Sequence, residues 1–120
     1  MVKSVQYILL LCMVGLLGHR TTAQYLTPVA EFGTNPGDLK MLIHVPDVLK
    51  KSKKRAPLVV VLHGCSQYGN RMAKQSGWNK LADYYGFYVL YPEQRMINNP
   101  QGCFTWFSNK DVSRTDGEMA

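Results

Sequence analysis

The sequence has few cysteines and few acidic residues, and it contains no internal repeat and no low-complexity tract. Its 120 residues include 3 cysteines, and its 14 basic residues outnumber its 8 acidic ones. The longest apolar run, residues 7–17, is shorter than the about 20 residues that span a bilayer, so we expect no stable membrane anchor. The positive charge favours solubility and gives no specific indication of a nucleic-acid partner.

The first 23 residues have the order of parts found in a secretory signal peptide. Lys3 supplies the positive start, residues 7–17 supply the apolar region, and residues 21–23 (Thr-Thr-Ala) end in small residues suited to cleavage before Gln24. A buried N-terminal helix is the alternative, but no helix cap precedes the run. We therefore expect a signal peptide over 1–23, a mature chain over 24–120, and a secreted protein, either extracellular or periplasmic.

Two apolar segments predict strands on either side of a basic stretch. Residues 39–45 predict one strand, and residues 58–62 (Leu-Val-Val-Val-Leu) predict a second. Five consecutive apolar residues are typical of a strand that is buried on both faces, as in a parallel sheet between helices. The stretch between them, residues 50–55, is rich in lysine and predicts a solvated loop rather than a surface for nucleic acid or anionic lipid.

The segment after these strands predicts a helix followed by a third strand. Apolar residues recur at helical spacing up to Tyr85, with Ser76 as the expected N-cap, Gly86 as a left-handed terminator and Trp78 as a core residue. Residues 87–91 predict a strand that ends at Pro92. A strand, a helix and a strand with short connections predict a parallel pair.

The remainder of the chain predicts irregular structure. Residues 93–113 contain Asn, Pro and Gly together with three aromatic residues, and residues 116–118 (Asp-Gly-Glu) have the composition of a helix start. Loops of this length inside compact domains are usually functional or held in place by other contacts.

The loop after residues 58–62 is the strongest candidate for chemistry. It begins His63-Gly64-Cys65, and loops that leave the carboxyl end of a buried parallel strand form the ligand sites of open α/β sheets. In α/β-hydrolases, a backbone N–H of the loop after the third strand helps to bind the oxyanion, and there His-Gly precedes a small residue. The Cys65 N–H is the matching donor. A simple tight turn is the alternative for so short a motif.

Several segments taken together extend this match. FGTNPGDLKMLIHVP, APLVVVLHGCSQ, SGWNKLADYYGFYVLYPEQ, NNPQGCFTWF and RTDGE resemble, in order, the extracellular polyhydroxybutyrate (PHB) depolymerase-type esterases, a group similar to feruloyl and acetylxylan esterases. They cover most of residues 32–118. The resemblance implies an α/β-hydrolase fold, a three-layer sandwich with a mostly parallel sheet. It also implies a serine esterase that cleaves polyhydroxyalkanoate, feruloyl or acetyl polysaccharide esters without a metal or another cofactor.

The chain departs from that family where the catalytic residues are expected. The family places its nucleophile in a G-x-S-x-G elbow beyond the helix that starts near Asp116, and its Asp and His follow later, so all three are missing here. We therefore expect residues 24–120 to be the N-terminal part of the domain, truncated before the elbow and inactive as an isolated chain. Whether the chain is an enzyme, which ester it would cleave and its oligomeric state stay open.

Ser66 and two histidines offer a weaker alternative to the missing triad. Ser66 lies in Gly-Cys-Ser-Gln-Tyr between a predicted strand and a helix, but Tyr68 stands where the elbow needs a small residue. His44 is expected to be structural, and His63 belongs to the oxyanion loop. Ser66 is therefore expected to be an ordinary polar loop residue.

Removal of the signal peptide leaves Cys65 and Cys103, which form one disulfide or remain two buried thiols. Cys65 follows one strand of the predicted parallel pair and Cys103 lies in the loop after the other, so both lie at the same sheet edge. This layout predicts a Cys65–Cys103 disulfide.

Trp106, with Phe104 and Phe107, is a candidate for substrate binding, and core packing of the long loop is the alternative. These aromatic residues also support a second hypothesis, a secreted non-catalytic module that binds a polymer. That hypothesis requires the mature chain to fold alone, which buried strands without a covering layer disfavour. A nonfunctional remnant is the third possibility.

Overall fold

The computed structural model describes residues 26–52 and 54–120. The predicted signal peptide over 1–23 and the predicted mature start at Gln24 lie outside the described residues. Within those ranges, no helix combines the length and the apolar character needed to cross a membrane.

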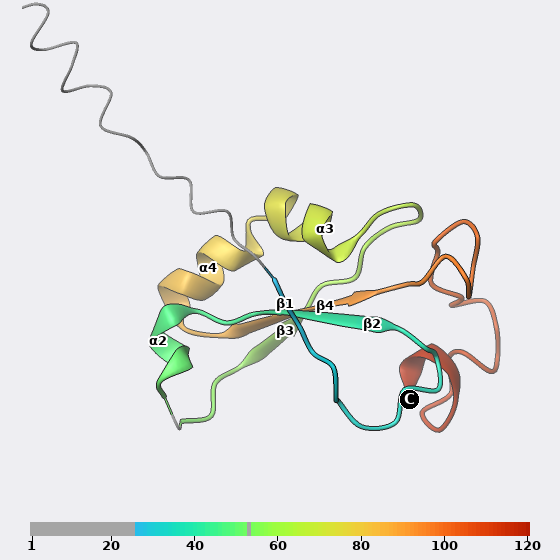
Figure 1. Ribbon diagram of the computed structural model, residues 1–120, viewed down its shortest axis with the longest axis horizontal. Coiled ribbons are helices and arrows are strands. Elements are labelled where there is room, and N and C mark those ends of the chain that lie inside the picture. Colours follow the sequence, from blue (N-terminus) through green and yellow to red (C-terminus); the bar gives the residue numbers. More distant parts are fainter. Residues whose placement is uncertain (1–25, 53) are drawn as a thin grey trace, which may run out of the picture.

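A four-stranded mixed sheet forms the centre of the described chain (Figure 1). Its strands are β1 (Thr27–Pro28), β2 (Lys40–His44), β3 (Leu58–Val60) and β4 (Tyr88–Glu93), arranged in the order β1-β2-β4-β3. β3 and β4 run parallel, which confirms the pair predicted from the strand–helix–strand pattern. The β1–β2 and β2–β4 pairs are antiparallel, so this part of the sheet is mixed.

Two helices connect the parallel strands where the sequence predicted one. α3 (Gly69–Gln75) and α4 (Trp78–Tyr85) follow each other closely, and a four-residue helix, α2 (Asp47–Lys50), precedes the basic stretch. Ser76 is the C-cap of α3, and the left-handed Gly77 is the N-cap of α4, so the predicted Ser76 N-cap is wrong. Gly86 ends α4 at φ 75°, as predicted, and donates its N–H to the Ala82 carbonyl at 2.8 Å.

β4 continues through Pro92 to Glu93, so the prediction that Pro92 ends the strand is wrong. Tyr88 donates its N–H to Pro57 O, and Leu90 O accepts from the Val61 N–H, so the even-numbered residues of β4 bond toward β3. Position 92 therefore also faces the β3 side, but β3 ends at Val60. A proline is tolerated there because position 92 lies beyond Leu90, the last residue of β4 that is paired with β3.

The core lies between one face of the sheet and the two longer helices. Val89 and Tyr91 are fully buried in the centre of β4, and Ala82 of α4 is fully buried as well. The Tyr91 hydroxyl donates to Asn79 Oδ1 at 2.6 Å, and burial raises the pKa of the Tyr91 phenol. Gly69 opens α3 so close to the sheet that a Cβ there would lie 2.9 Å from Leu42 Cδ1. This contact brings the start of α3 directly against β2 and β4.

The opposite face of β3 is exposed, which contradicts the prediction that residues 58–62 are buried on both faces. Leu58, Val60 and Leu62 are each more than half exposed, while Val61 is buried on the helix side. The physical reason is that α3 and α4 both lie on one side of β4, as Figure 1 shows. Exposed and at least partly buried side chains therefore alternate along β3, because within the described residues helices cover only one face of the sheet.

Three smaller predictions concern side chains around the sheet. His44 is buried and its Nε2 lies 2.7 Å from Asp83 Oδ1 of α4, which confirms a structural role. Lys50, Lys51, Lys54 and Arg55 are exposed, as the predicted solvated loop requires. Trp78 is 37% exposed and packs edge-on against Phe87, so it lies at the margin of the core rather than inside it.

Candidate functional site

The candidate site is the turn that follows β3 at the carboxyl end of the parallel pair. The Val61 N–H still donates to Leu90 O at 2.8 Å, and the chain then leaves the sheet through residues 62–68 before α3 begins. Val61 and His63 are buried while Leu62 between them is exposed. The strand-like alternation therefore continues past β3 and turns the His63 side chain into the molecule.

Hydrogen bonds within the turn fix its shape. Gln67 donates its N–H to Gly64 O at 3.1 Å, and the Gly64 N–H donates to Gln67 Oε1 at 3.0 Å. Cys65 and Ser66 are thus the central residues of a four-residue turn. Ser66 has φ 57°, a left-handed conformation that is unfavourable for residues with a Cβ.

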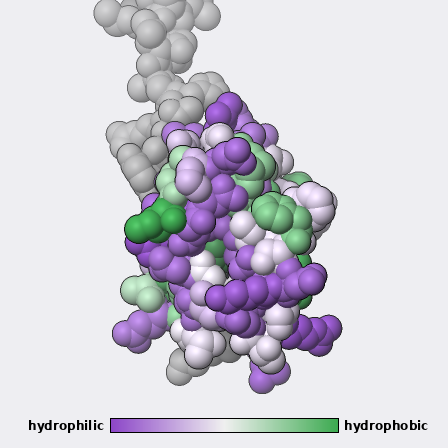
Figure 2. Space-filling view, turned by 90° about the vertical axis from the view of Figure 1, so that its right-hand side faces the viewer, coloured by the Kyte–Doolittle hydropathy of each residue, from purple (hydrophilic) through white to green (hydrophobic). Residues whose placement is uncertain are grey.

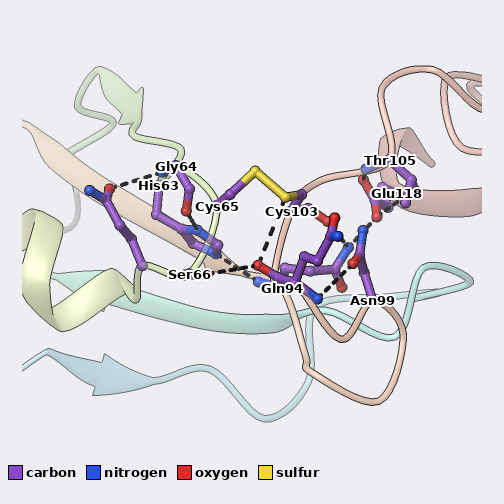
Figure 3. The surroundings of a disulfide bond; sticks show 11 residues. His63, Gly64, Cys65, Ser66, Gln94, Asn99, Cys103, Thr105 and Glu118 are labelled. Carbon is purple, nitrogen blue, oxygen red and sulfur yellow. Dashed lines mark hydrogen bonds between the residues drawn. A yellow bond between two sulfur atoms is a disulfide. The ribbon is translucent and has the colours of Figure 1, made fainter.

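The loop after β4 holds this turn from the outside (Figure 3). Gln101 O accepts two hydrogen bonds from Ser66, one from its N–H at 3.0 Å and one from its hydroxyl at 3.1 Å. A disulfide joins Cys65 to Cys103, 38 residues later in the sequence, as the strand layout predicted. Two residues of the turn are therefore tied to two nearby residues of the later loop.

The Cys65 N–H is left available by this arrangement. The N–H groups on both sides of it, those of Gly64 and Ser66, have acceptors, whereas that of Cys65 has none among the residues that the structure describes. Cys65 itself is exposed. A backbone N–H without an internal acceptor, in a turn held by hydrogen bonds and a disulfide, can donate to an oxygen that gains negative charge, which is the chemistry of an oxyanion hole.

His63 is buried beside the turn, and both nitrogens of its ring are engaged. Its Nε2 accepts from the Gln94 N–H at 2.9 Å, and its Nδ1 lies 2.7 Å from Gly64 O. Its ring lies 4.7 Å from that of Phe104. A histidine held in this way does not present a free nitrogen to take a proton from a nucleophile.

The structure gives Ser66 no activating base. Its hydroxyl donates to Gln101 O, and both nitrogens of the neighbouring His63 are occupied. His44, the last residue of β2, bonds to Asp83. It is paired with Val89 at the start of β4, whereas the turn lies at the carboxyl end of β4, so His44 is far from Ser66 along the sheet. Among the described residues, Ser66, His44 and His63 are therefore not arranged as a catalytic triad.

Polar residues that the sequence did not single out hold the long loop in place. Gln94 donates from Nε2 to Cys103 O at 3.3 Å and also to Glu118 Oε1. Glu118 accepts the Thr105 N–H at 2.8 Å and the Thr105 hydroxyl at 2.7 Å. Gln94 is buried, which is unusual for a glutamine. In the sequence, the one signal for it was its position directly after a strand.

The segment 116–118 forms a short 3₁₀ helix, η1 (Gly117–Met119), which fits the predicted helix start. Asp116 Oδ1 caps it by accepting the Gly117 N–H at 2.9 Å. Met119 then donates its N–H to Asp111 O at 3.1 Å. Hydrogen bonds from Thr105 and Ser108 lower the pKa of the Asp111 carboxyl. Residues 94–113 are irregular, as predicted. The hydrogen bonds of Glu118 and Met119 join η1 to this segment.

The aromatic residues of the loop differ in their surroundings. Phe104 packs on His63, whereas Trp106 and Phe107 are 77% and 67% exposed and meet edge to face. The alternative of core packing is therefore wrong for Trp106 and Phe107. Figure 2 shows the end of the molecule where these loops gather; hydrophilic residues cover most of it, and hydrophobic residues form separate patches.

Groups of three or more His, Cys, Asp or Glu side chains with a metal-binding arrangement do not occur among residues 26–52 and 54–120.

Comparison with known protein families gives one match over most of this region. Residues 42–120 match the family model described as esterase PHB depolymerase. The matched part begins within β2 and includes the turn after β3, the disulfide and η1.

Two relatives illustrate the range of similar proteins. The chain is 47% identical over 93 residues to poly(3-hydroxyalkanoate) depolymerase C of Paucimonas lemoignei, covering 78% of this chain and 22% of the relative. It is 30% identical over 95 residues to feruloyl esterase B of Talaromyces funiculosus, covering 79% of this chain and 25% of the relative. The chain thus spans a quarter or less of the length of these relatives.

Two solved structures have a similar fold. A PHB depolymerase complexed with an R3HB trimer aligns with a TM-score of 0.55 at 28% identity, covering 74% of this chain and 34% of that one. An acetyl xylan esterase from Aspergillus awamori aligns with a TM-score of 0.50 at 35% identity, covering 57% and 24%. The mixed sheet and its helices therefore correspond to part of an α/β-hydrolase domain.

Proposed function

Because the chain belongs to the esterase PHB depolymerase family, we propose that it is part of a secreted carboxylic ester hydrolase of that type. One observation carries the proposal: the N–H of the exposed residue Cys65 lacks an acceptor among the described residues and lies in a turn tied by hydrogen bonds and a disulfide. It lies at the carboxyl end of a parallel strand, where α/β folds place their reactive groups.

In this function the Cys65 N–H is one donor of the oxyanion hole. When a nucleophile attacks the ester carbonyl, the carbonyl oxygen gains negative charge, and a donor already in place stabilises it without reorganisation. One such donor contributes about 3–4 kcal/mol to transition-state stabilisation. The nucleophilic serine, its histidine and its aspartate would come from sequence that the relatives have outside the matched segment.

We further propose that residues 1–23 direct secretion, into the medium or the periplasm, and that residues 24–120 supply the first part of the catalytic domain. N-terminal sequencing of the exported protein should begin at Gln24. An exported protein that still begins at Met1 would contradict the cleavage site.

The names of the relatives and the exposed aromatic pair support a proposed substrate class, esters carried by a polymer. Similar proteins are named for polyhydroxyalkanoates, feruloyl esters and acetylxylan, and all three are esters presented by a polymer. We propose that Trp106 contributes to binding such a substrate, and its high exposure in the loop that the disulfide ties to the turn supports this role.

The test begins with the coding sequence. Sequencing the transcript and the gene beyond the codon for Ala120 should reveal, in this frame or a neighbouring one, a G-x-S-x-G motif followed by an Asp and a His. The complete translated product should hydrolyse p-nitrophenyl butyrate and lose that activity with a serine-directed phosphonate. An authentic stop codon with no such motif downstream would overturn the esterase proposal.

The high exposure of Trp106 and Phe107 favours a second candidate, a non-catalytic module that binds an insoluble polymer. This candidate predicts that the secreted chain itself unfolds cooperatively and is retained by PHB granules or by acetylated xylan. A chain that folds but is not retained by either polymer would contradict it. A remnant without function would show neither hydrolysis nor retention.

A further inference from the structure

The Cys65 N–H and the Gly64 carbonyl belong to one peptide group. Such a group is planar and trans, so its N–H and C=O point in opposite directions. Whatever fixes the direction of the Gly64 carbonyl therefore also fixes the direction of the Cys65 N–H. The partners of Gly64 O thus determine where the candidate oxyanion donor points.

Two donors hold the Gly64 carbonyl from inside the turn. The Gln67 N–H reaches it at 3.1 Å, and His63 Nδ1 lies 2.7 Å from it. Both approach the carbonyl oxygen, so the Cys65 N–H on the opposite side of the same peptide group points away from them. Hydrogen bonds to a peptide carbonyl also polarise the N–H of the same group, so they strengthen the donor as well as orient it.

The protonation of His63 follows from its second contact. The Gln94 backbone N–H can only donate, and it lies 2.9 Å from His63 Nε2, so Nε2 is the unprotonated nitrogen. In the neutral ring the proton then lies on Nδ1, which donates it to Gly64 O. Figure 3 shows the ring between Gly64 and Gln94. The strand end at Gln94 thus selects the tautomer that the turn requires.

We propose that His63 is a positioning residue for the Cys65 N–H, acting through the Gly64 carbonyl in a tautomer set by the Gln94 N–H. The inference deepens the proposed function and rests on it for its catalytic meaning. The buried position of His63, 5% exposed against Phe104, holds the imidazole in this geometry. The disulfide anchors the Cys65 side chain, and His63 orients the peptide group before it.

The first test measures the tautomer in the full, unmodified chain. In the ¹⁵N-labelled protein at neutral pH, His63 Nδ1 should show the shift of a protonated nitrogen and Nε2 that of an unprotonated one. The reverse pattern would overturn the proposal, because an Nε2–H could not accept from Gln94 and Nδ1 could not donate to Gly64.

The second test measures the order of the Cys65 N–H vector by ¹⁵N relaxation. We expect an order parameter of about 0.85 in the unmodified chain and below about 0.6 in His63→Phe, which keeps a packed ring but loses both nitrogens. His63→Asn, whose amide N–H₂ lies near the position of Nδ1, should restore much of the order. His44→Phe, in β2 beside the start of β4, is the matched control and should leave Cys65 unchanged.

An unchanged order parameter in His63→Phe, or a loss that His63→Asn does not restore, would overturn the proposal. If His63→Phe does not fold, the tautomer measurement on the unmodified chain decides. None of these readouts involves ester hydrolysis. A missing G-x-S-x-G motif would therefore defeat the proposed function and leave these results intact, and a wrong tautomer would defeat the positioning role alone.

Discussion

Glu118 binds Thr105 at two points, accepting its N–H at 2.8 Å and its hydroxyl at 2.7 Å across 13 residues of irregular chain. The same carboxylate also accepts from Gln94 Nε2. A segment without strands or α-helices is thus closed at its base by one half-buried acidic residue. Because the loop between them carries Trp106, this contact determines where the exposed aromatic residues lie.

Glu118→Gln should loosen residues 94–113. The amide would place N–H donors where three donors now converge, leaving at least one of them without an acceptor at a cost of about 1–3 kcal/mol. Hydrogen exchange should show faster exchange at the Thr105 amide, and a protease should cut the loop sooner. Glu31→Gln, at an exposed position, is the control. Equal protection of Thr105 in both variants would contradict the role of Glu118.

Loss of the disulfide should lower the stability of the whole described fold. Closing a loop of 38 residues restricts the unfolded chain, so Cys65→Ser with Cys103→Ser should reduce the free energy of unfolding by about 2–4 kcal/mol. Urea unfolding of the oxidised chain and the double variant measures this difference. Two reactive thiols in the folded, unreduced chain would show that the bond does not form.

Gly69→Ala should destabilise the contact between α3 and the sheet. The added Cβ would lie 2.9 Å from Leu42 Cδ1 and 3.2 Å from Tyr91 Cβ, so the Leu42 side chain would have to move and α3 would have to shift from Tyr91 by a few tenths of an ångström. We expect a loss of about 1–3 kcal/mol in urea unfolding, typical of overpacking. Asn70→Ala, at the next and exposed position of α3, should change stability by less than about 0.5 kcal/mol. Similar stability of the two variants would show that α3 is not packed so closely.

Two substitutions at Ser66 separate its backbone conformation from its hydroxyl. Both Ser66→Ala and Ser66→Gly remove the hydroxyl hydrogen bond to Gln101 O and keep the backbone one, but only alanine keeps the Cβ that is unfavourable at φ 57°. The glycine variant should therefore be more stable than the alanine variant by about 1 kcal/mol. Thermal unfolding of the pair measures the difference, and the reverse order would contradict the left-handed conformation.

Trp106→Ala should affect polymer binding far more than stability. The side chain is 77% exposed, so we expect a change in unfolding free energy of less than about 0.5 kcal/mol and a clear loss of retention on PHB granules. Tyr84→Ala, which removes an 81% exposed aromatic residue from α4, is the matched control for non-specific adsorption. Equal retention of both variants would argue against Trp106 as a binding residue.

Local chemistry was enough to predict much of this fold. Residues 58–62 are apolar and mostly β-branched, and the strand forms over Leu58–Val60. Gly86 adopts the left-handed conformation, and the strands on either side of the helical region pair in parallel, as their patterns predicted. The disulfide followed from the same topology, because parallel strands bring the residues that follow them to one edge. These features depend on periodicity and on backbone conformation, which neighbouring residues decide.

Other features depended on residues far apart in the sequence. The extension of β4 through Pro92 depends on where β3 ends, and the exposed face of β3 depends on which side the helices take. Ser76 could have capped α4, but α3 precedes it and uses that position. Sequence patterns contain no information on these neighbours, so the local predictions failed there.

The sequence by itself determined the family, through residues that follow one another in recognisable order, and it placed the candidate oxyanion donor at Cys65. Only the tertiary structure decided how that donor is held. Gln94 lies 31 residues after His63, Gln101 lies 35 residues after Ser66, and Glu118 lies 24 residues after Gln94. All three have ordinary polar side chains in the sequence. They gain a role because the fold brings a strand end and a long loop against one turn, where each buried donor needs an acceptor.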